Sequence, residues 1–305
     1  KGERRRRKKV AGASSMLGAA LTNECIRRGT EVVAIAHRGS KKLSAVPRGD
    51  LVTLIEADLG ELCAKDLPES DALCHFGWAG TSREQRNDPN VQCENIAQTL
   101  CAARLARECG CKVFLGAGSQ AEYGKVDGKI TTETRVQPLT CYGTAKFAAG
   151  KLSRRFCDDR GILHIWTRIF SVYGPHDGES TMIKYALRCF SEGETAHFSA
   201  AVQPWNYLHE RDAAKLFYLL CERAKTSGVY NVASDDTRPL KSFIEEMRAV
   251  AGDAKCDYAP SSPDVIGLDP DISETLAAVG EMNFIPFSEG IAEMLPLYKR
   301  AGDKA

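Results

Sequence analysis

Short runs of apolar residues alternate along the first half of the chain with longer segments of helical periodicity. The apolar runs are continuous, which is typical of strands buried on both faces of a parallel sheet. The runs span residues 31–36, 51–57, 71–76, 111–118 and 161–170, and the clearest helical patterns span 90–108 and 141–160. This alternation predicts an α/β fold with a doubly wound, Rossmann-like parallel sheet.

The pattern changes after about residue 170, where the chain becomes irregular and rich in Pro and Gly, as in VYGPHDGES. Strand-like segments return further on, in WNYLH and GVYNVAS. We expect a second unit that is interleaved with the sheet. The predicted organisation is a dinucleotide-binding domain over 1–170, whose sheet also receives segments near 204–235, and a smaller C-terminal α/β lobe over 171–305 that mainly binds substrate.

Six consecutive basic residues, Arg4 to Lys9, stand where the first strand of such a sheet would lie. A central strand is buried on both faces, and burying one unpaired cation costs on the order of several kcal/mol. Three arrangements remain: a strand truncated to Val10–Ala11 with the basic segment in solvent, a basic segment that pairs only at its edges, or a terminus that differs from that of a functional ancestor. The first and third are favoured, so we predict a truncated or atypical first strand.

A turn of small residues, GASSMLG, follows at residues 12–18 and opens a helical pattern. Small side chains let the backbone approach a pyrophosphate, and the free N–H groups and positive dipole end of the helix favour an anion. A turn that only caps a helix has the same composition. We predict dinucleotide contacts from the residues of this turn, which are Gly12, Ser14, Ser15, Met16, Leu17 and Gly18.

The end of the next strand bears on the choice of dinucleotide. An acidic residue at the end of this strand, about 20 residues after the glycine turn, binds the ribose hydroxyls of NAD, whereas a basic one accommodates the additional phosphate of NADP. The sequence here is HRGSKK, with basic side chains at His37, Arg38, Lys41 and Lys42. We therefore favour NADP over NAD, with a solvated basic loop as the alternative. Asp58 and Leu59, after the following strand, are candidate contacts to the adenine, although Asp58 also fits an exposed strand-end carboxylate.

The segment YGTAK carries the clearest chemical signal. Tyr142 and Lys146 stand four residues apart on a predicted helix, so their side chains share one face. A free phenol titrates near pH 10, but a neighbouring ammonium and a positive nicotinamide ring both favour the phenolate. We predict that Tyr142 is the general acid or base, that Lys146 lowers its pKa and binds the nicotinamide ribose, and that Ser119, after the strand KVFL, holds the same substrate oxygen.

These motifs together resemble the extended short-chain dehydrogenase/reductase family, in its NAD(P)-dependent nucleotide-sugar epimerase/dehydratase branch. The resemblance runs from Val10 to about Leu297, and the order and spacing of the motifs agree. The motifs are GASSMLG, ADL at 57–59, HFGWAG at 75–80, NIAQTL from Asn95, GSQAEYG, YGTAK, RIFSVYGP from Arg168, WNYLHERDAAK from Trp205, GVYNVAS from Gly228 and PDIS from Pro270.

The resemblance implies a nucleoside-diphosphate sugar as substrate and a homodimer formed through the helices at 90–108 and 141–160. It also implies further site residues. Those implied for the cofactor are Gly77, Trp78, Ala79, Asn95, Phe170 and Val172, and those implied for the substrate are Gln120, Ser171 and Trp205. Asn95 and the segment at Tyr173–Pro175 also fit purely structural roles.

The chain departs from its relatives at positions that carry chemistry. Sugar 4,6-dehydratases of this family have an Asp-Glu pair after the residue that matches Ser119, and here those positions are Gln120 and Ala121, which transfer no protons. Glu122 is a poor substitute, one place further on. We therefore predict a 4-keto reductase or a 4-epimerase and not a 4,6-dehydratase, with the basic loop favouring the reductase. Ser171 stands where relatives often carry asparagine near the diphosphate, and Trp205 where many carry arginine.

Composition narrows the function classes. The formal charge is +1, but residues 1–9 hold seven basic side chains and one acidic side chain, so the remainder is net negative and we expect no nucleic-acid partner. No run approaches the roughly 20 apolar residues that cross a bilayer. The chain has 12 cysteines without a Cys-x-x-Cys pair and no closely spaced histidines, so we expect free thiols, no metal and a cytoplasmic location. The alternative function is a non-catalytic dinucleotide sensor or pseudoenzyme on the same fold.

Overall fold

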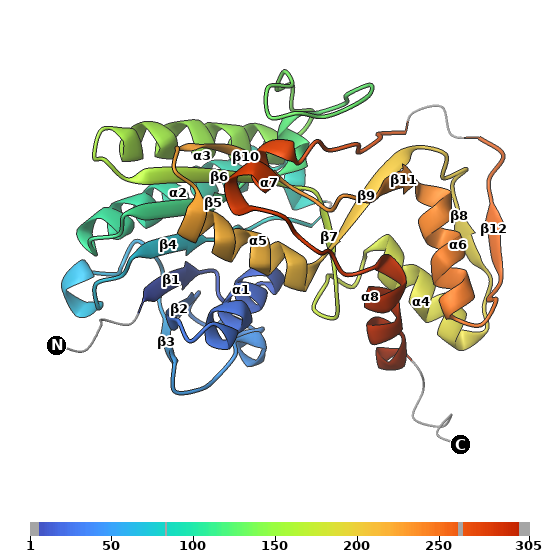
Figure 1. Ribbon diagram of the computed structural model, residues 1–305, viewed down its shortest axis with the longest axis horizontal. Coiled ribbons are helices and arrows are strands. Elements are labelled where there is room, and N and C mark those ends of the chain that lie inside the picture. Colours follow the sequence, from blue (N-terminus) through green and yellow to red (C-terminus); the bar gives the residue numbers. More distant parts are fainter. Residues whose placement is uncertain (1–5, 83, 262–264, 299–305) are drawn as a thin grey trace.

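The computed structural model describes residues 6–82, 84–261 and 265–298 (Figure 1). Its larger part is a seven-stranded sheet in the order β10-β6-β5-β4-β1-β2-β3, with every neighbouring pair parallel. The strands are β1 (Arg7–Ala11), β2 (Glu31–Ala36), β3 (Val52–Glu56), β4 (Ala72–His75), β5 (Val113–Ala117), β6 (Leu163–Ile169) and β10 (Gly228–Val232). The prediction of a doubly wound α/β fold is confirmed. The strand order reverses beside β1, which is where such sheets bind ligands.

Helices cover both faces of this sheet (Figure 1). Helices α2 and α3 pack together on one face, and α1 and α5 pack together on the other. Residues of β2 alternate between the two cores, with Val32 and Ala34 on the α1/α5 side and Val33 and Ile35 on the α2/α3 side. This alternation explains why the strands are apolar throughout. The helices of this part are α1 (Met16–Arg27), α2 (Pro89–Glu108), α3 (Cys141–Asp158), α5 (Glu210–Arg223) and α7 (Ser273–Val279).

Local signals set where these helices begin. Helix α1 is capped by Ser15, whose Oγ accepts from Gly18 N, and α3 is capped by Thr140, whose Oγ1 accepts from Gly143 N. Asp88 caps α2 in the same way, and a proline occupies the first helical position. A side-chain oxygen at this position satisfies N–H groups that have no partner inside the helix.

A smaller unit lies beyond the carboxyl ends of the sheet strands (Figure 1). An apolar core that includes Tyr173, Phe243 and Phe287 holds it together. It contains a three-stranded sheet of β11 (Thr237–Pro239), β9 (Pro204–His209) and β7 (Ser171–Tyr173), a pair of β12 (Cys256–Tyr258) and β8 (Ala196–Phe198), and the helices α4 (Met182–Glu192), α6 (Leu240–Val250) and α8 (Phe287–Met294). Short 3-10 turns occur at Leu43–Ala45, Ala64–Asp66, Gln85–Asn87, Gln120–Glu122 and Leu295–Leu297.

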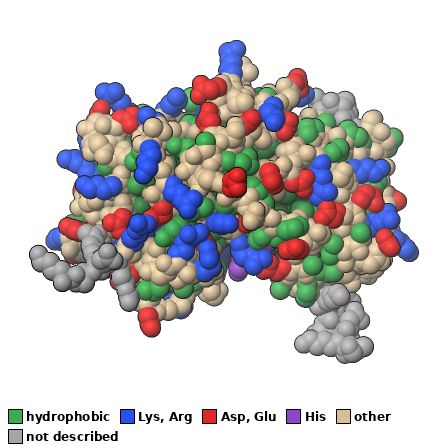
Figure 2. Space-filling view, in the orientation of Figure 1, with side chains coloured by type: hydrophobic (Ala, Val, Ile, Leu, Met, Phe, Trp, Pro, Cys, Tyr) green, Lys and Arg blue, Asp and Glu red, His purple; other side chains and the backbone are tan. Residues whose placement is uncertain are grey.

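The two units are interleaved along the chain. Of the segments near 204–235, β10 joins the seven-stranded sheet, whereas β9 lies in the smaller unit. A domain boundary at residue 170 stays a prediction. Side chains of both charges are spread over both units on the face shown in Figure 2.

Within the described residues, no helix combines the length and the apolar character that crossing a bilayer requires. No group of histidine, cysteine and carboxylate side chains in this part of the chain could hold a metal ion. All 12 cysteines are free thiols. Seven of them are buried, and several fill helix faces toward the two sheet cores.

The prediction of a truncated first strand is wrong. Strand β1 begins at Arg7 and pairs with β2 and β4 along its length, so Lys8 and Lys9 occupy the middle of the sheet. Lys8 is 1% exposed and Lys9 is fully buried. Arg4 and Arg5, earlier in the basic segment, lie outside the described residues.

Pairing of both ammonium groups explains why the sheet tolerates these lysines. The Lys8 Nζ forms an ion pair with Glu222 of α5 and lies 4.6 Å from the ring centroid of Tyr218. On the opposite face, the Lys9 Nζ donates to the Pro68 carbonyl and, at 2.7 Å, to Ser70 Oγ. The aliphatic part of each lysine packs like an apolar side chain while its charge reaches a polar partner. A sequence pattern that counts lysine as polar misses this arrangement.

We expect Glu222→Leu to lower the free energy of unfolding by about 3 kcal/mol, because it leaves Lys8 buried without its carboxylate. The double variant Lys8→Met/Glu222→Leu should recover most of this loss, since the buried charge is then absent. Equilibrium urea unfolding measures both. Glu61→Leu is a matched control, because Glu61 pairs with Arg38 on the exposed surface, where such pairs contribute about 1 kcal/mol or less. A single variant as stable as the wild type would contradict this account.

Candidate active site

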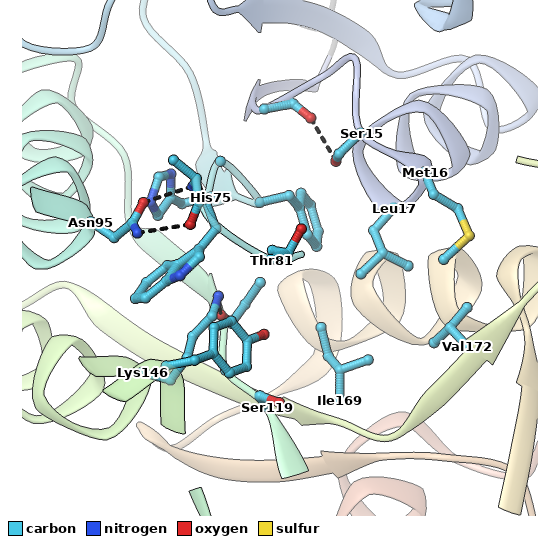
Figure 3. A pocket seen from close by; sticks show the side chains of 18 of the residues that line it. Ser15, Met16, Leu17, His75, Thr81, Asn95, Ser119, Lys146, Ile169 and Val172 are labelled. Atoms are coloured by element: carbon cyan, nitrogen blue, oxygen red, sulfur yellow. Dashed lines mark hydrogen bonds between the residues drawn. The ribbon is translucent and has the colours of Figure 1, made fainter. Parts of the chain in front are cut away.

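A cavity of about 1280 Å³ lies between the carboxyl ends of the sheet strands and the smaller unit. Figure 3 shows Ser15, Met16 and Leu17 on one side of it, with Lys146 and Ser119 on another. All but two of the predicted site residues line this cavity. The two exceptions are Gly18, which packs inside its turn, and Arg38, which pairs with Glu61.

The glycine turn holds the backbone of β1 against that of the loop after β4. Gly12 has a φ of +79°, and a Cβ placed on it would lie 2.4 Å from Gly77 N. A Cβ on Gly18 would lie 2.3 Å from the Gly12 carbonyl oxygen. The Ser15 Oγ donates to that same carbonyl at 2.7 Å. Only glycine satisfies both the positive φ and the close approach.

The turn presents donors to the cavity. Ser14, Ser15, Met16 and Leu17 line it at the start of α1, and the first turn of that helix holds no acidic residue. Free backbone N–H groups, hydroxyls and the positive end of a helix dipole form a donor set that suits a pyrophosphate. The residues present therefore fit a dinucleotide at this turn.

The loop after β2 carries mixed charge. His37 Nε2 lies 3.1 Å from Asp58 Oδ1, and both residues line the cavity beside Lys42 and Leu59. Arg38 turns away and donates from Nη2 to Glu61 at 2.9 Å. Two of the basic residues of this loop, His37 and Lys42, therefore line the cavity, next to a carboxylate.

Ser119, Tyr142 and Lys146 come together at the carboxyl end of β5. The Ser119 hydroxyl lies near enough to the Tyr142 phenol to favour its ionised form and so lower its pKa. The Lys146 Nζ donates to the Ala117 carbonyl at 2.6 Å, and lies 3.6 Å from the ring centroid of Trp78 and 5.7 Å from that of Tyr142. A phenol and an amine from α3 thus face the cavity beside a hydroxyl from the turn after β5.

Burial sets the proton affinities of this group. It lowers the pKa of Lys146 to about 7, with the charge of Glu122 opposing the shift. It also raises the pKa of Tyr142, while the Ser119 hydroxyl and the positive charge of Arg86 act in the opposite direction. Removing the phenol from water therefore outweighs the effects of Ser119 and Arg86 in the chain by itself. That Lys146 lowers the pKa of Tyr142 stays a prediction.

Glu122 has a structural role behind Ser119. It is fully buried, ion-paired with Arg168 at 2.9 Å, and accepts hydrogen bonds from Trp166 Nε1 and from Ser119 N, both at 2.9 Å. Its carboxylate fixes the backbone of Ser119 in a capping box. Gln120 lines the cavity, whereas Glu122 does not.

Asn95 holds the loop that follows β4. Its Oδ1 accepts from Ala79 N at 2.8 Å and its Nδ2 donates to the Ala79 carbonyl at 3.0 Å. Neighbouring Gln92 accepts from Trp78 Nε1 at 2.9 Å. These bonds place Gly77, Trp78 and Ala79 along the cavity wall.

The end of the cavity nearest the smaller unit is aromatic and carries one carboxylate. The lining residues there include Phe170, Trp205 and Tyr207, together with Ser171 and Val172. Asp177 supplies the carboxylate, and burial raises its pKa, with the Gly178 N–H opposing the shift. The described lysines and arginines of the lining are Lys42, Arg86 and Lys146, and all three come from the sheet side.

Sequence reasoning missed two cavity residues close to the catalytic candidates. Arg86 Cζ lies 4.3 Å from the ring centroid of Tyr142. His75, at the end of β4, is fully buried with Nδ1 unpartnered among the described residues, and burial lowers its pKa to about 3. His75 is the first residue of the motif HFGWAG, so the sequence pointed to its neighbourhood. Arg86 belongs to the turn at Gln85–Asn87, and no sequence motif pointed to it.

Comparison with known proteins agrees with this geometry. The model of a family described as NAD dependent epimerase/dehydratase matches residues 9–233. The probable UDP-arabinose 4-epimerase 3 of Arabidopsis thaliana is 25% identical over 291 residues, covering 83% of this chain and 71% of that protein. The dTDP-6-deoxy-L-talose 4-dehydrogenase (NAD(+)) of Aggregatibacter actinomycetemcomitans is 23% identical over 250 residues, covering 79% and 88%. UDP-glucuronic acid 4-epimerase from Bacillus cereus, solved in complex with NAD, shares the fold with a TM-score of 0.83 at 18% identity and 96% coverage of each chain.

We expect Gly12→Ala to destabilise the protein at least twice as much as Gly29→Ala. Both glycines have positive φ, +79° and +67°, but a Cβ at Gly29 would meet no atom within 4 Å. The control variant Gly29→Ala therefore carries only the conformational strain of about 1 kcal/mol. The difference in unfolding free energy between the two variants measures the cost of the contact between a Cβ at position 12 and Gly77. Equal urea midpoints for the two variants would show that the close approach is not needed.

The buried amine of Lys146 predicts a pH dependence of stability. Between pH 7 and about 10 the unfolded chain binds more protons at this residue than the folded chain, because the folded pKa of about 7 lies below the unfolded value. The contribution of Lys146 to the free energy of unfolding of the wild type therefore rises with pH over that range. Lys146→Met should be more stable relative to the wild type at pH 6.5 than at pH 9, as measured by urea unfolding.

The control for that experiment is Lys151→Met, an exposed lysine on the same helix. It should show no change in its stability difference from the wild type between the two pH values. A constant difference for Lys146→Met as well would mean that its amine is not displaced toward the neutral form by burial.

Proposed function

We infer the function from the premise that the chain belongs to the NAD dependent epimerase/dehydratase family, a branch of the extended short-chain dehydrogenases/reductases. We propose that it is an NAD(P)-dependent enzyme that transfers hydride at a ring carbon of a nucleoside-diphosphate sugar, as a 4-epimerase or a 4-keto reductase. The observation that carries the proposal is the convergence of Ser119, Tyr142 and Lys146 on one wall of a cavity that begins at the glycine turn.

Each of these side chains has a distinct task in the proposed reaction. A bound nicotinamide dinucleotide would accept or donate the hydride. Tyr142 takes the proton from the substrate hydroxyl as the carbon is oxidised, and returns it to the oxygen when a ketone is reduced. The Ser119 hydroxyl holds that oxygen beside the phenol. Lys146 lines the cavity 5.7 Å from the ring centroid of Tyr142 and binds the ribose next to the nicotinamide.

The choice of dinucleotide rests on the loop after β2. His37 and Lys42 favour NADP, because they place an imidazole and an ammonium near the position of its additional phosphate. Asp58, 3.1 Å from His37, favours the hydroxyls of NAD instead, and one solved relative, from Bacillus cereus, is a complex with NAD. We keep NADP as the favoured cofactor and NAD as the alternative. Measuring the dissociation constant of each dinucleotide from the purified protein decides between them.

The dehydratase reaction is not proposed. Gln120 and Ala121 offer no group that exchanges protons, and Glu122 is engaged by Arg168, Trp166 and the backbone of Ser119. A carboxylate that holds three partners behind the cavity wall is not available to a leaving hydroxyl. Oxidation and reduction at one carbon remain.

The substrate class rests on the relatives, whose names include UDP-arabinose 4-epimerase and dTDP-6-deoxy-L-talose 4-dehydrogenase. In this chain Ser171 and Trp205 line the part of the cavity proposed for the nucleotide. We also propose a homodimer through the outer faces of α2 and α3, where Leu152 is 49% exposed. The free state of all 12 cysteines supports a reducing compartment such as the cytoplasm.

The alternative of a non-catalytic sensor has lost the feature that favoured it. That alternative depended on a damaged first strand, and β1 is complete with both of its lysines paired. A set of catalytic side chains next to an intact glycine turn supports an enzyme.

We expect Tyr142→Phe to reduce turnover by about 10²-fold or more, because the phenol exchanges the substrate proton, while leaving dinucleotide affinity nearly unchanged. The assay follows nicotinamide absorbance and product isomers with a panel of UDP- and dTDP-linked sugars and keto-sugars. Tyr185→Phe is the control, since its hydroxyl accepts from His197 N outside the cavity. Undiminished turnover in Tyr142→Phe would remove this residue from the proposed role. No turnover of any panel member by the wild type with either dinucleotide would reject the proposed function.

A further inference from the structure

Arg86 carries a guanidinium that no carboxylate of the described residues pairs with. It belongs to the 3-10 turn at Gln85–Asn87 and lines the cavity. Its guanidinium carbon lies 4.3 Å from the ring centroid of Tyr142. Among the described residues, no carboxylate forms an ion pair with it. A guanidinium stacked on an aromatic ring inside a cavity is held by the ring and is available to a negative charge on that ring's oxygen.

Hydrogen bonds to three different segments fix the turn that carries Arg86. Arg86 N donates to the Ser82 carbonyl at 3.0 Å. The side chain of Gln92 on α2 donates to the Gln85 carbonyl at 3.1 Å, and Asn87 Oδ1 accepts from Cys141 N at 3.2 Å. Cys141 is the first residue of α3 and precedes Tyr142. The turn that carries Arg86 is therefore hydrogen-bonded to the start of the helix that carries Tyr142.

The distances and charges of the two cations near Tyr142 distinguish their effects. The Lys146 Nζ is 5.7 Å from the ring centroid of Tyr142 and points to the Ala117 carbonyl and Trp78. Burial lowers the pKa of Lys146 to about 7, so at higher pH its charge is increasingly lost. Arg86 lies closer, and a guanidinium stays protonated over the whole working range.

The remaining charged groups around Tyr142 do not replace Arg86. Glu122, behind Ser119, acts against a phenolate, and its own charge is balanced by Arg168. His75 is neutral at working pH, because burial lowers its pKa to about 3. Trp78 is uncharged and packs edge-on against the Tyr142 ring, with 6.0 Å between the two ring centroids.

We propose that Arg86 is a positioning residue for Tyr142, and that its guanidinium stabilises the phenolate to which the substrate proton is transferred. The inference rests on the proposed function for its chemical meaning. In the oxidative direction the substrate O–H bond breaks and its proton moves to the phenolate oxygen. The C–H bond of the carbon that bears this oxygen breaks as the C=O bond forms, and its hydride would pass to a bound nicotinamide. In the reductive direction the phenol returns that proton. Arg86 contributes charge to both directions and exchanges no proton.

The test observes Tyr142 directly. The protein is produced with 3-fluorotyrosine, whose phenol is more acidic than that of tyrosine, and fluorine NMR is recorded against pH without substrate or dinucleotide. The Tyr142 resonance is the one absent from the Tyr142→Phe protein. We expect the midpoint of its titration to rise by about one pH unit in Arg86→Gln. Arg86→Lys, which keeps the charge, should lie between Arg86→Gln and the wild type.

Arg160→Gln is the matched control. Arg160 also stacks on an aromatic ring, 3.9 Å from the centroid of Phe156, but on the exposed surface away from the cavity. Its replacement should leave the Tyr142 midpoint in place. An unchanged midpoint in Arg86→Gln, in a protein whose other tyrosine resonances match the wild type, would overturn the inference.

Turnover provides a second, separate readout. The acid limb of the profile of kcat/KM against pH should move upward in Arg86→Gln by the same amount as the midpoint, with Arg86→Lys restoring part of the change. If no protein in the series turns over a sugar nucleotide, the proposed function fails, and the NMR midpoint still decides whether Arg86 acts on Tyr142. The failure of one is therefore distinguishable from the failure of the other.

Discussion

The satisfaction of two buried ammonium groups is the constraint on which the rest of this structure depends. Strand β1 lies at the reversal of the strand order, and the glycine turn that contacts the cavity follows directly from its end. Its position places the side chains of Lys8 and Lys9 on opposite faces of the sheet. Glu222 forms an ion pair with Lys8 on one face, and Ser70 accepts a hydrogen bond from Lys9 on the other. Without these partners, burial of the lysines would oppose the placement of the whole turn.

The low polarity of the cavity wall has two opposite consequences for the proposed chemistry. Burial disfavours the charged form of every group, so it raises the pKa of Tyr142 and lowers that of Lys146. At neutral pH the shared wall therefore holds the uncharged phenol of Tyr142 beside the amine of Lys146, which is close to the midpoint of its titration. A fixed guanidinium and a hydroxyl partner act against the cost of forming a phenolate. In the proposed reaction, the composition of the wall therefore governs proton transfer together with the identity of the Tyr-Lys pair.

The fold and most cavity residues could be predicted because they follow from local patterns. The run at 31–36 matches β2, and the pattern at 141–160 matches α3 within two residues. Positions such as Gly12 and Ser119 follow strand ends, which meet at one edge of a parallel sheet. Lys8 was misjudged because its partner Glu222 lies more than two hundred residues away, and a one-dimensional pattern gives no information about such a pair. The sequence pattern likewise gave no sign that Arg38 pairs with Glu61, 23 residues further along the chain.

The sequence by itself determined the α/β class, the glycine turn, and the spacing that puts Tyr142 and Lys146 on one helix face, because these depend on periodicity and on the chemistry of single residues. Only the tertiary structure decided which charges are paired and which face the cavity. It placed Glu122 in an ion pair and left Arg86 against Tyr142. The physical reason is that burial and electrostatic energies depend on distances in space between segments that are remote in the chain.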